Sequence, residues 1–249
     1  MHNIFALLVA APLAHATWSV TAVDPSTGAV GIAGATCGPF VWGIAGLAPG
    51  AGVVAAQYDT STRRRDIAVD ALLDGASAEA ALTDALADDG ARVYRQYAVW
   101  DLDGGFAGHT GSEVEGAADI LVGDGVSAQG NTLRPGVVGA AFAAVDAAEG
   151  PLERRLLAGL IAGAEAGGDT RCDAADAAKS AFLYVADPGD DRKEPRVEIR
   201  AAGKGAAAEV AAALRSGDMS CASAPAGASG AAAAALGGLA ALLRRRRRA

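Results

Sequence analysis

The residue whose type and position best suggest chemistry is Thr17, which begins the first polar–apolar alternation after a short apolar leader. A threonine at the start of a chain carries a hydroxyl nucleophile and a free α-amine on one residue. The amine has a reference pKa of about 7.7–8.0, so near neutral pH it can accept the hydroxyl proton as a general base. Removal of residues 1–16 would therefore make Thr17 a candidate nucleophile for amide hydrolysis. The alternative is an ordinary edge-strand threonine.

Other common chemistries find little support in the residue types. The histidines are His2, His15 and His109, so a chain that begins at Thr17 keeps only His109. The three cysteines form no Cys-x-x-Cys pair, which argues against a structural zinc site. Glycine patterns at residues 50–55 and 123–128 match the dinucleotide fingerprint only loosely, and neither opens a helix after a parallel strand. We expect no cofactor and no metal.

The charge balance argues against nucleic-acid partners. The formal net charge is −8, but five of the 21 basic residues are the terminal run 244–248, and the remainder carries 16 basic against 29 acidic residues, a net of −13. A chain with this negative charge repels the phosphate backbones of nucleic acids. The hydrophobic fraction of 51% is high enough for a large core.

The N-terminal segment is typical of an export signal. Residues 1–16 read MHNIFALLVAAPLAHA, and residues 4–13 form an apolar run of h-region length. Residues 14–16, Ala-His-Ala, supply the small-x-small pattern that signal peptidase accepts. The sequence therefore predicts export with cleavage after Ala16, and a buried N-terminal strand is the alternative.

The C-terminal segment is typical of a membrane anchor or sorting tail. Residues 222–243 carry no charge and are long enough to span a bilayer, and arginines 244–248 would stay cytoplasmic. The order of Cys221, spacer 222–228, helix 229–243 and arginine cluster resembles the myxobacterial C-terminal sorting signal. Such tails are removed by a membrane protease, so the body would be surface-anchored or released. The alternative is an alanine-rich disordered tail.

The elements that must position Thr17 follow from periodicity and turn signals. Strands are predicted at residues 17–24 and 29–36 as a hairpin, and helices at 66–73 and 78–87 with Ser77 as an N-cap. The other predicted strands are residues 41–47, 52–57, 94–101, 106–110, 118–122, 126–129, 180–186 and 196–200; the other helices lie around 138–145, 152–160 and 204–215. Strand groups alternating with helix pairs indicate an α+β fold with antiparallel sheets covered by helices.

Several segments resemble the bacterial family called domain of unknown function 1028. The segments, which cover about residues 17–200 in order, are TWSVTAVDPSTGAVGIAGAT (17–36), HTG (109–111), VSAQGNTL (126–133), GPLERRLLAGLIAGAEAGGD (150–169) and SAFLYV (180–185). The resemblance implies an N-terminal-nucleophile hydrolase-like fold, a four-layer αββα sandwich of two antiparallel sheets between helices. Members that lack a signal peptide begin Met-Thr-Phe-Ser, and loss of the methionine would expose the same threonine.

On this basis the domains are a signal peptide (1–16), a hydrolase-like domain (17–216), a linker (217–228) and the tail (229–249). The predicted protein is an exported amide-bond hydrolase that acts on an unknown peptide or small-molecule amide, and an oligomer is compatible with the sequence. Its other partners would be signal peptidase, a C-terminal sorting protease and, through the tail, the membrane.

The candidate site residues beside Thr17 come from the same comparison. Asn131, within GNT, is the candidate oxyanion donor, although a turn residue is an equal alternative; Gln57, His109 and Asp169 are weaker candidates. Cys37 stands where the family commonly has a basic residue that would assist the amine. That departure keeps a second hypothesis open, in which the protein is a catalytically silent binding or structural module of the same fold.

The cysteines divide into a candidate pair and a single residue. Cys37 and Cys172 both replace non-cysteine residues of the family pattern, and export would place them in an oxidising compartment, which suggests a disulfide between them. Two unrelated buried thiols are the alternative. Cys221 is assigned to the tail as a candidate for processing or lipid attachment.

Overall fold

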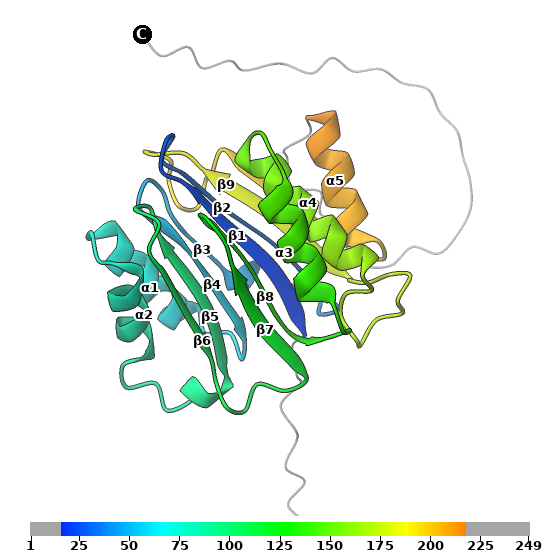
Figure 1. Cartoon of the computed structure of the whole chain (residues 1–249), viewed down its shortest axis with the longest axis horizontal. Coiled ribbons are helices and arrows are strands. Elements are labelled where there is room, and N and C mark those ends of the chain that lie inside the picture. The colour runs from blue at the N-terminus through cyan, green and yellow to red at the C-terminus, as the bar shows by residue number, and fades with distance from the viewer. Residues whose placement is uncertain (1–15, 218–249) are drawn as a thin grey trace, which may run out of the picture.

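The computed structural model describes residues 16–217, which form two antiparallel sheets with helices on their outer faces (Figure 1). The larger sheet has six strands in the order β10–β9–β2–β1–β8–β7. These strands are β1 (Thr17–Asp24), β2 (Ala29–Thr36), β7 (Ala117–Val122), β8 (Val126–Leu133), β9 (Ser180–Ala186) and β10 (Val197–Ala202). β1 therefore lies inside the sheet, between β2 and β8.

The smaller sheet has four strands in the order β3–β4–β5–β6, and β1 and β2 pack against it. Its strands are β3 (Ala45–Ala48), β4 (Gly52–Tyr58), β5 (Arg95–Asp101) and β6 (Phe106–Thr110). Its outer face carries α1 (Thr62–Leu73) and α2 (Ala78–Leu86). The N-caps of these helices are Ser61 and the predicted Ser77, each of which accepts a backbone N–H three residues on.

The outer face of the larger sheet carries α3 (Val137–Ala147), α4 (Leu152–Glu165) and α5 (Ala206–Ser216). Two glycines bring α4 close to β1. A Cβ at Gly159 would lie 2.8 Å from Cγ1 of Val20, and one at Gly163 would lie 2.4 Å from Nε1 of Trp18. That indole Nε1 donates to the Leu160 carbonyl at 3.3 Å. The helix therefore fixes β1, the strand that begins at Thr17, from its outer side.

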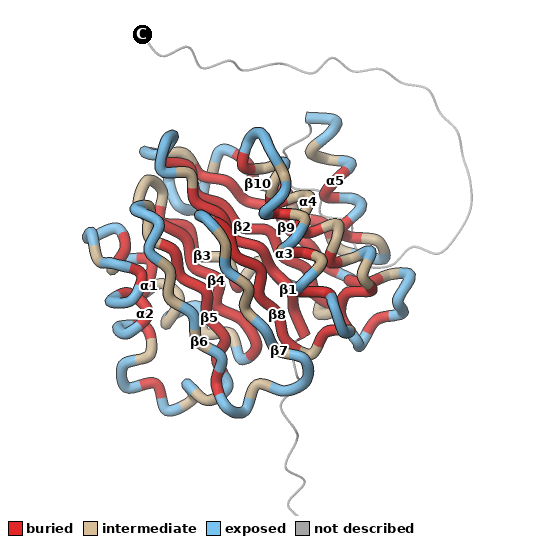
Figure 2. Tube along the Cα trace, viewed as in Figure 1, coloured by how far each residue is buried: buried red, intermediate tan, exposed pale blue. Residues whose placement is uncertain are grey.

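Three buried layers hold the elements together, and the strands form the most deeply buried part of the chain (Figure 2). The outer layers lie beneath α3–α5 and beneath α1–α2 and are apolar. The middle layer, between the sheets, is apolar only in part: it includes Ile32, Trp100 and Phe182. Toward the start of β1 this layer contains polar side chains: Ser19 donates a hydrogen bond to Gln57 of the other sheet. Buried polar groups without hydrogen-bond partners cost free energy, so the hydrogen bonds that this region makes restrict the geometry around it.

Several predicted boundaries were wrong, and two of the errors bear on the site. Residues 41–47 do not form one strand: Trp42–Ile44 is a 3₁₀ turn that precedes β3, and a short apolar run does not by itself distinguish a strand from a helical turn. β8 does not end at residue 129 but continues to Leu133, so Asn131 is a strand residue and the turn alternative is wrong. The edge-strand alternative for Thr17 is wrong as well, since β1 has a partner on each side.

The predicted leader and the predicted tail lie outside the described residues, except for Ala16 and the final residues of the body. The residues on either side of the predicted cleavage site, Ala16 and Thr17, are described, whereas Cys221 and the arginine cluster lie outside the described residues. Within residues 16–217, no helix is both long enough and apolar enough to cross a bilayer.

Candidate functional site

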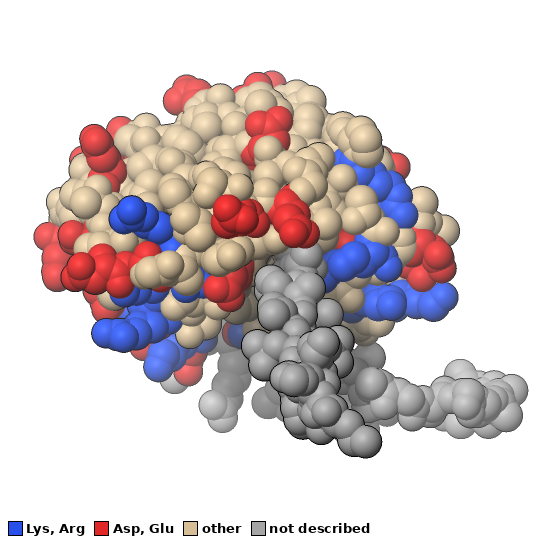
Figure 3. All heavy atoms as spheres, turned by 90° about the horizontal axis from the view of Figure 1, so that it is seen from below, with Lys and Arg blue, Asp and Glu red and all other residues tan. Residues whose placement is uncertain are grey.

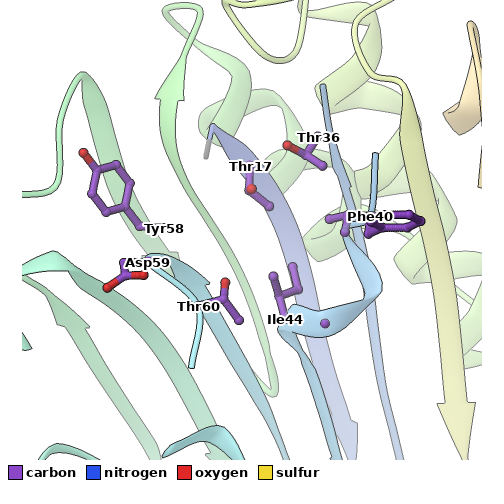
Figure 4. A pocket seen from close by; sticks show the side chains of 9 residues that line it. Thr17, Thr36, Phe40, Ile44, Tyr58, Asp59 and Thr60 are labelled. Carbon is purple, nitrogen blue, oxygen red and sulfur yellow. The ribbon is translucent and has the colours of Figure 1, made fainter. Parts of the chain in front are cut away.

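Thr17 begins β1 at one end of the layer between the sheets, where it faces a pocket of about 170 Å³ (Figure 4). The register places Thr17 opposite Thr36 of β2 on one side and opposite Asn131 of β8 on the other. The side chain of Thr17 is 3% exposed. In Figure 4 it lies between the segment that carries Tyr58 and the segment that carries Phe40. The predicted nucleophile is thus held in a central strand and borders a cavity.

Beneath Thr17, a hydrogen-bonded network links the two sheets and includes two of the predicted site residues. Asn131 Nδ2 and Gln57 Nε2 both donate to Oε1 of Gln96, at 3.0 and 2.7 Å. Ser19 Oγ donates to Gln57 Oε1 at 3.1 Å and accepts from Gln129 Nε2 at 2.7 Å. All five side chains are at most 1% exposed. The network fixes the Asn131 amide opposite Thr17.

Asn131 retains hydrogen-bonding capacity within this network. Its Nδ2 uses one of two hydrogens for Gln96, and among residues 16–217 its buried Oδ1 has no hydrogen-bond partner. A buried amide group left half-satisfied costs free energy, and such groups are found where a ligand supplies the missing partner. The amide is therefore a candidate for contact with a bound molecule.

On the other side of Thr17, Asp169 and Arg171 form an ion pair around the end of β2. Asp169 is fully buried; its Oδ2 lies 2.6 Å from Nη2 of Arg171 and accepts the Cys37 N–H at 2.7 Å. Nη2 of Arg171 donates to the Ala16 carbonyl oxygen at 2.9 Å, and the Thr36 hydroxyl donates to the same oxygen. The peptide bond between Ala16 and Thr17 thus lies beside a buried carboxylate and a guanidinium.

A disulfide and an arginine hold this ion pair in place. Cys37 and Cys172, the pair suggested from the sequence, are joined across 135 residues with their Cα atoms 5.8 Å apart. Arg134 donates to the carbonyl oxygens of Asp169 and Cys172, each at 2.7 Å. The loop that carries Asp169 and Arg171 is therefore tied to the end of β2, directly beside the strand that begins at Thr17.

The opposite wall of the pocket begins at the end of β4. Tyr58 has a φ of 72°, an unfavourable backbone conformation for a residue with a Cβ, and it directly precedes Asp59. Burial raises the pKa of Tyr58, so its phenol stays neutral over the physiological range. Asp59 Oδ2 lies 2.8 Å from Nη1 of Arg95, whose Nε also donates to Asp89. Hydrogen bonds from Arg95 hold the pKa of Asp89 below its usual range. The strained turn is thus fixed by an ion-paired cluster.

His109 lies elsewhere. His109 belongs to β6 and pairs with Tyr97 of β5, and Tyr97 faces the layer beneath α1 and α2 and not the layer between the sheets. Its Nε2 lies 3.0 Å from the Arg92 carbonyl oxygen. The structure therefore does not bring His109 to the Thr17 pocket. It gathers Asn131, Gln57 and Asp169 around the start of β1, although none of the three is among the described residues that line the pocket.

Charges of both signs surround this end of the molecule. Figure 3 views the molecule from the end where β1 begins, and in the visible part of that face Lys and Arg side chains are mixed with Asp and Glu side chains. A face of mixed sign lacks the continuous positive field that binds phosphate backbones.

Comparison with known proteins identifies the family. Residues 17–209 match the model of DUF1028, described as a family of unknown function. The chain belongs to DUF1028. It is 32% identical to protein SPO2555 from Silicibacter pomeroyi, whose crystal structure is titled as a DUF1028 protein; the match covers 81% of this chain and 85% of that chain with a TM-score of 0.70. Among curated proteins, none matches this sequence.

In this DUF1028 chain, three residues that the fold brings to Thr17 were not predicted from the sequence: Thr36, Arg171 and Gln96. Thr36 could have been found, because the predicted hairpin pairs residue 17 with residue 36. Arg171 and Gln96 could not, since their contacts with the site join segments 155 and 35 residues apart. Sequence spacing contains no information about such contacts until the order of the strands is known.

Proposed function

We propose that this DUF1028 protein is an exported amide-bond hydrolase of the N-terminal-nucleophile type, with a four-layer αββα sandwich as its framework. The observation that carries the proposal is the position of Thr17. It is the first residue of a buried central strand, it faces a pocket, and it directly follows the predicted cleavage site. The ion pair of Asp169 and Arg171 supports it, because this pair lies at the Ala16–Thr17 peptide bond and would influence the protonation of the α-amine that cleavage creates.

In the proposed reaction, Thr17 Oγ1 attacks the carbonyl carbon of a substrate amide while its own α-amine takes the hydroxyl proton. The C–N bond then breaks, the departing amine receives that proton, and an ester to Thr17 remains. Water hydrolyses the ester, which releases the acid and restores the hydroxyl. Asn131 is the proposed oxyanion donor, through the Nδ2 hydrogen that Gln96 does not use.

Arg171 is the proposed substitute for the basic residue that Cys37 replaces. Its guanidinium reaches the position next to the Thr17 nitrogen from the loop after α4 instead of from the end of β2. A cation at this distance disfavours the protonated amine and so keeps more of the base form near neutral pH. The observation weakens the case for a catalytically silent module, which rested on the missing basic residue.

Replacement of Arg171 by leucine is expected to lower kcat/KM at pH 7 by about 10²-fold and to move the acidic limb of the pH–rate profile upward, because the amine is then protonated more readily. Arg171→Lys keeps the charge and is expected to retain most of the activity. An unchanged profile in Arg171→Leu would show that the guanidinium has only a structural role.

Export and sorting are part of the proposal. Residues 1–16 would be removed by signal peptidase. The linker 217–228 would connect the body to the hydrophobic helix of the tail (229–249), and a sorting protease would later cleave the chain near Cys221. A host-expressed protein is then expected in the envelope or the medium without its terminal arginines.

The decisive experiment is the mass and N-terminal sequence of the protein purified from an exporting host. We expect Thr17 as the first residue and hydrolysis of members of a panel of N-acyl amides. The matched control is a chain that starts at Ala16, in which the Thr17 nitrogen stays in a peptide bond and cannot act as a base. A different natural terminus, or equal turnover by the Ala16 form, would refute the mechanism and leave the silent module as the better description.

A further inference from the structure

We infer that the pocket beside Thr17 binds the side chain of a small, uncharged, aliphatic acyl residue, so that the substrates are amides whose scissile carbonyl belongs to a residue such as valine or leucine. The inference rests on the proposed function, because it assigns a substrate class to the same site.

The walls of the pocket differ in chemistry. The apolar lining residues are Phe40, Val41 and Ile44. The polar ones are Thr17, Thr36, Tyr58, Asp59 and Thr60, which are labelled with Phe40 and Ile44 in Figure 4. An apolar wall beside a nucleophilic hydroxyl accommodates an aliphatic side chain while the attached carbonyl lies at the hydroxyl. The apolar wall can therefore bind the side chain of the residue that carries the scissile carbonyl.

The charges of the lining exclude acidic acyl residues. No Lys, Arg or His is among the nine described lining residues, and the one ionisable group with a negative charge is Asp59. A carboxylate side chain would lose part of its hydration without meeting a cation among these lining residues. A cationic side chain gains little, because Asp59 is already paired with Arg95 at 2.8 Å.

The size of the pocket excludes large ligands. Sites for drug-sized molecules have volumes of about 300–1,000 Å³, whereas this pocket has about 170 Å³. That space accommodates a single aliphatic side chain. The remainder of a substrate would lie over the surface.

The rim includes an unusually exposed aromatic ring. Phe40 is 74% exposed, yet its ring packs edge-on against Trp42 at 5.4 Å, and Arg200 lies over Trp42 at 5.5 Å. The ring is thus held in place at the mouth of the pocket by an aromatic and cationic stack. An exposed apolar side chain held in this way would cover a bound aliphatic group.

The test measures acyl selectivity in the mature protein with N-acetyl-aminoacyl p-nitroanilides of alanine, valine, leucine, glutamate and lysine. We expect valine or leucine to give the highest kcat/KM, about 10-fold or more above glutamate and lysine. The highest kcat/KM for glutamate, lysine or alanine would overturn the inference.

Two variants test whether this pocket determines the selectivity. A Cβ built at Gly43, a lining residue, has no neighbour within 4 Å, so Gly43→Val fits without displacing the wall and is expected to shift preference toward alanine by about 10-fold. Phe40→Ala is expected to lower kcat/KM for leucine about 10-fold with little effect on alanine. The matched controls are Gly90→Val, which also adds a side chain in open space, and Leu73→Ala, which also removes an exposed apolar side chain. Equal shifts in the controls would overturn the inference.

A binding measurement separates failure of this inference from failure of the proposed function. If no anilide is hydrolysed, N-acetyl-leucinamide and N-acetyl-glutamic acid α-amide are titrated into Thr17→Ala by NMR. Binding of the leucine compound alone, lost in the Phe40→Ala double variant, supports the pocket assignment although catalysis fails. Absence of binding, or a preference for the glutamate compound, overturns it.

Discussion

Replacement of Thr17 by alanine is expected to lower the rate of amide hydrolysis by about 10⁴-fold or more, because the variant keeps the α-amine but has no nucleophile. The fold should tolerate the change. Thr17 is 3% exposed, and alanine removes a hydroxyl and a methyl group without adding a contact that the pocket cannot accommodate. The expected change in melting temperature is therefore a few degrees. Initial rates on the best anilide, together with thermal unfolding of the same samples, measure both quantities.

Two variants of the same strand are the controls. Thr17→Ser keeps the hydroxyl and the amine and is expected to retain activity within about 10-fold. Thr21→Ala removes a buried hydroxyl on the same face of β1, where it lies 2.6 Å from the Ser127 hydroxyl, and should lose stability but not activity. Loss of activity in Thr21→Ala equal to that in Thr17→Ala would show that the hydroxyls of β1 act through the fold and that Thr17 is not the nucleophile.

Much of the fold could be predicted from local signals. The β1–β2 hairpin follows from the turn at residues 24–28, where Asp24 accepts hydrogen bonds from Ser26 and Thr27 and Gly28 has a φ of 77°. The α3–α4 pair follows from apolar spacing and from Pro151, which is the N-cap of α4. These features depend on residues close in the sequence, so the sequence alone determines them.

Features that depend on burial between the sheets were less predictable. β8 was predicted to end at Gln129 because Gly130 and Asn131 come next, and glycine and asparagine are typical turn residues. The strand continues here because both residues pair with β1, and because Gln96, from the other sheet, accepts from Asn131 Nδ2 and donates to the Gly130 carbonyl oxygen. His109 shows the complementary error: alternation in β6 separates two faces but does not indicate which of them meets the other sheet.

The structure changes the meaning of one departure from the family pattern. Cys37 stands at the end of β2, where the resemblance implies a basic residue, and this departure kept open the alternative of a catalytically silent module. In the structure, that cysteine joins the loop that carries Arg171, and the guanidinium lies at the Ala16 carbonyl. The cysteine at position 37 thus replaces one cation of the family pattern and also anchors the loop that carries a second cation, Arg171. We infer that the disulfide has a role in the chemistry of the site as well as in stability.

Removal of the disulfide by the double change Cys37→Ser and Cys172→Ser is accordingly expected to lower the free energy of unfolding by about 4–5 kcal/mol in the chain-entropy model, because the bond closes a loop of 135 residues. For a domain of this size, that corresponds to a fall in melting temperature of roughly 10–15 °C. Activity should fall more than stability predicts, since the Cys37 N–H holds Asp169 Oδ2 at 2.7 Å and Asp169 orients Arg171. The measurements are thermal unfolding and kcat/KM at a temperature at which both forms stay folded.

Cys221→Ser is the matched control, because it removes a cysteine that the disulfide does not use, and its body is expected to melt as the wild type does. Incubation of the wild type with dithiothreitol should reproduce the stability and the kinetics of the double variant, which separates the loss of the bond from the change of side chain. The reduced protein is further expected to show the same upward movement of the acidic limb as Arg171→Leu, because a released loop takes the guanidinium away from the Thr17 amine. Two results would contradict this prediction: free thiols at Cys37 and Cys172 on labelling of the denatured, unreduced protein, or a melting temperature and pH profile that reduction leaves unchanged. In either case the disulfide does not connect stability with catalysis, and Arg171 is held at the site by Arg134 and Asp169 alone.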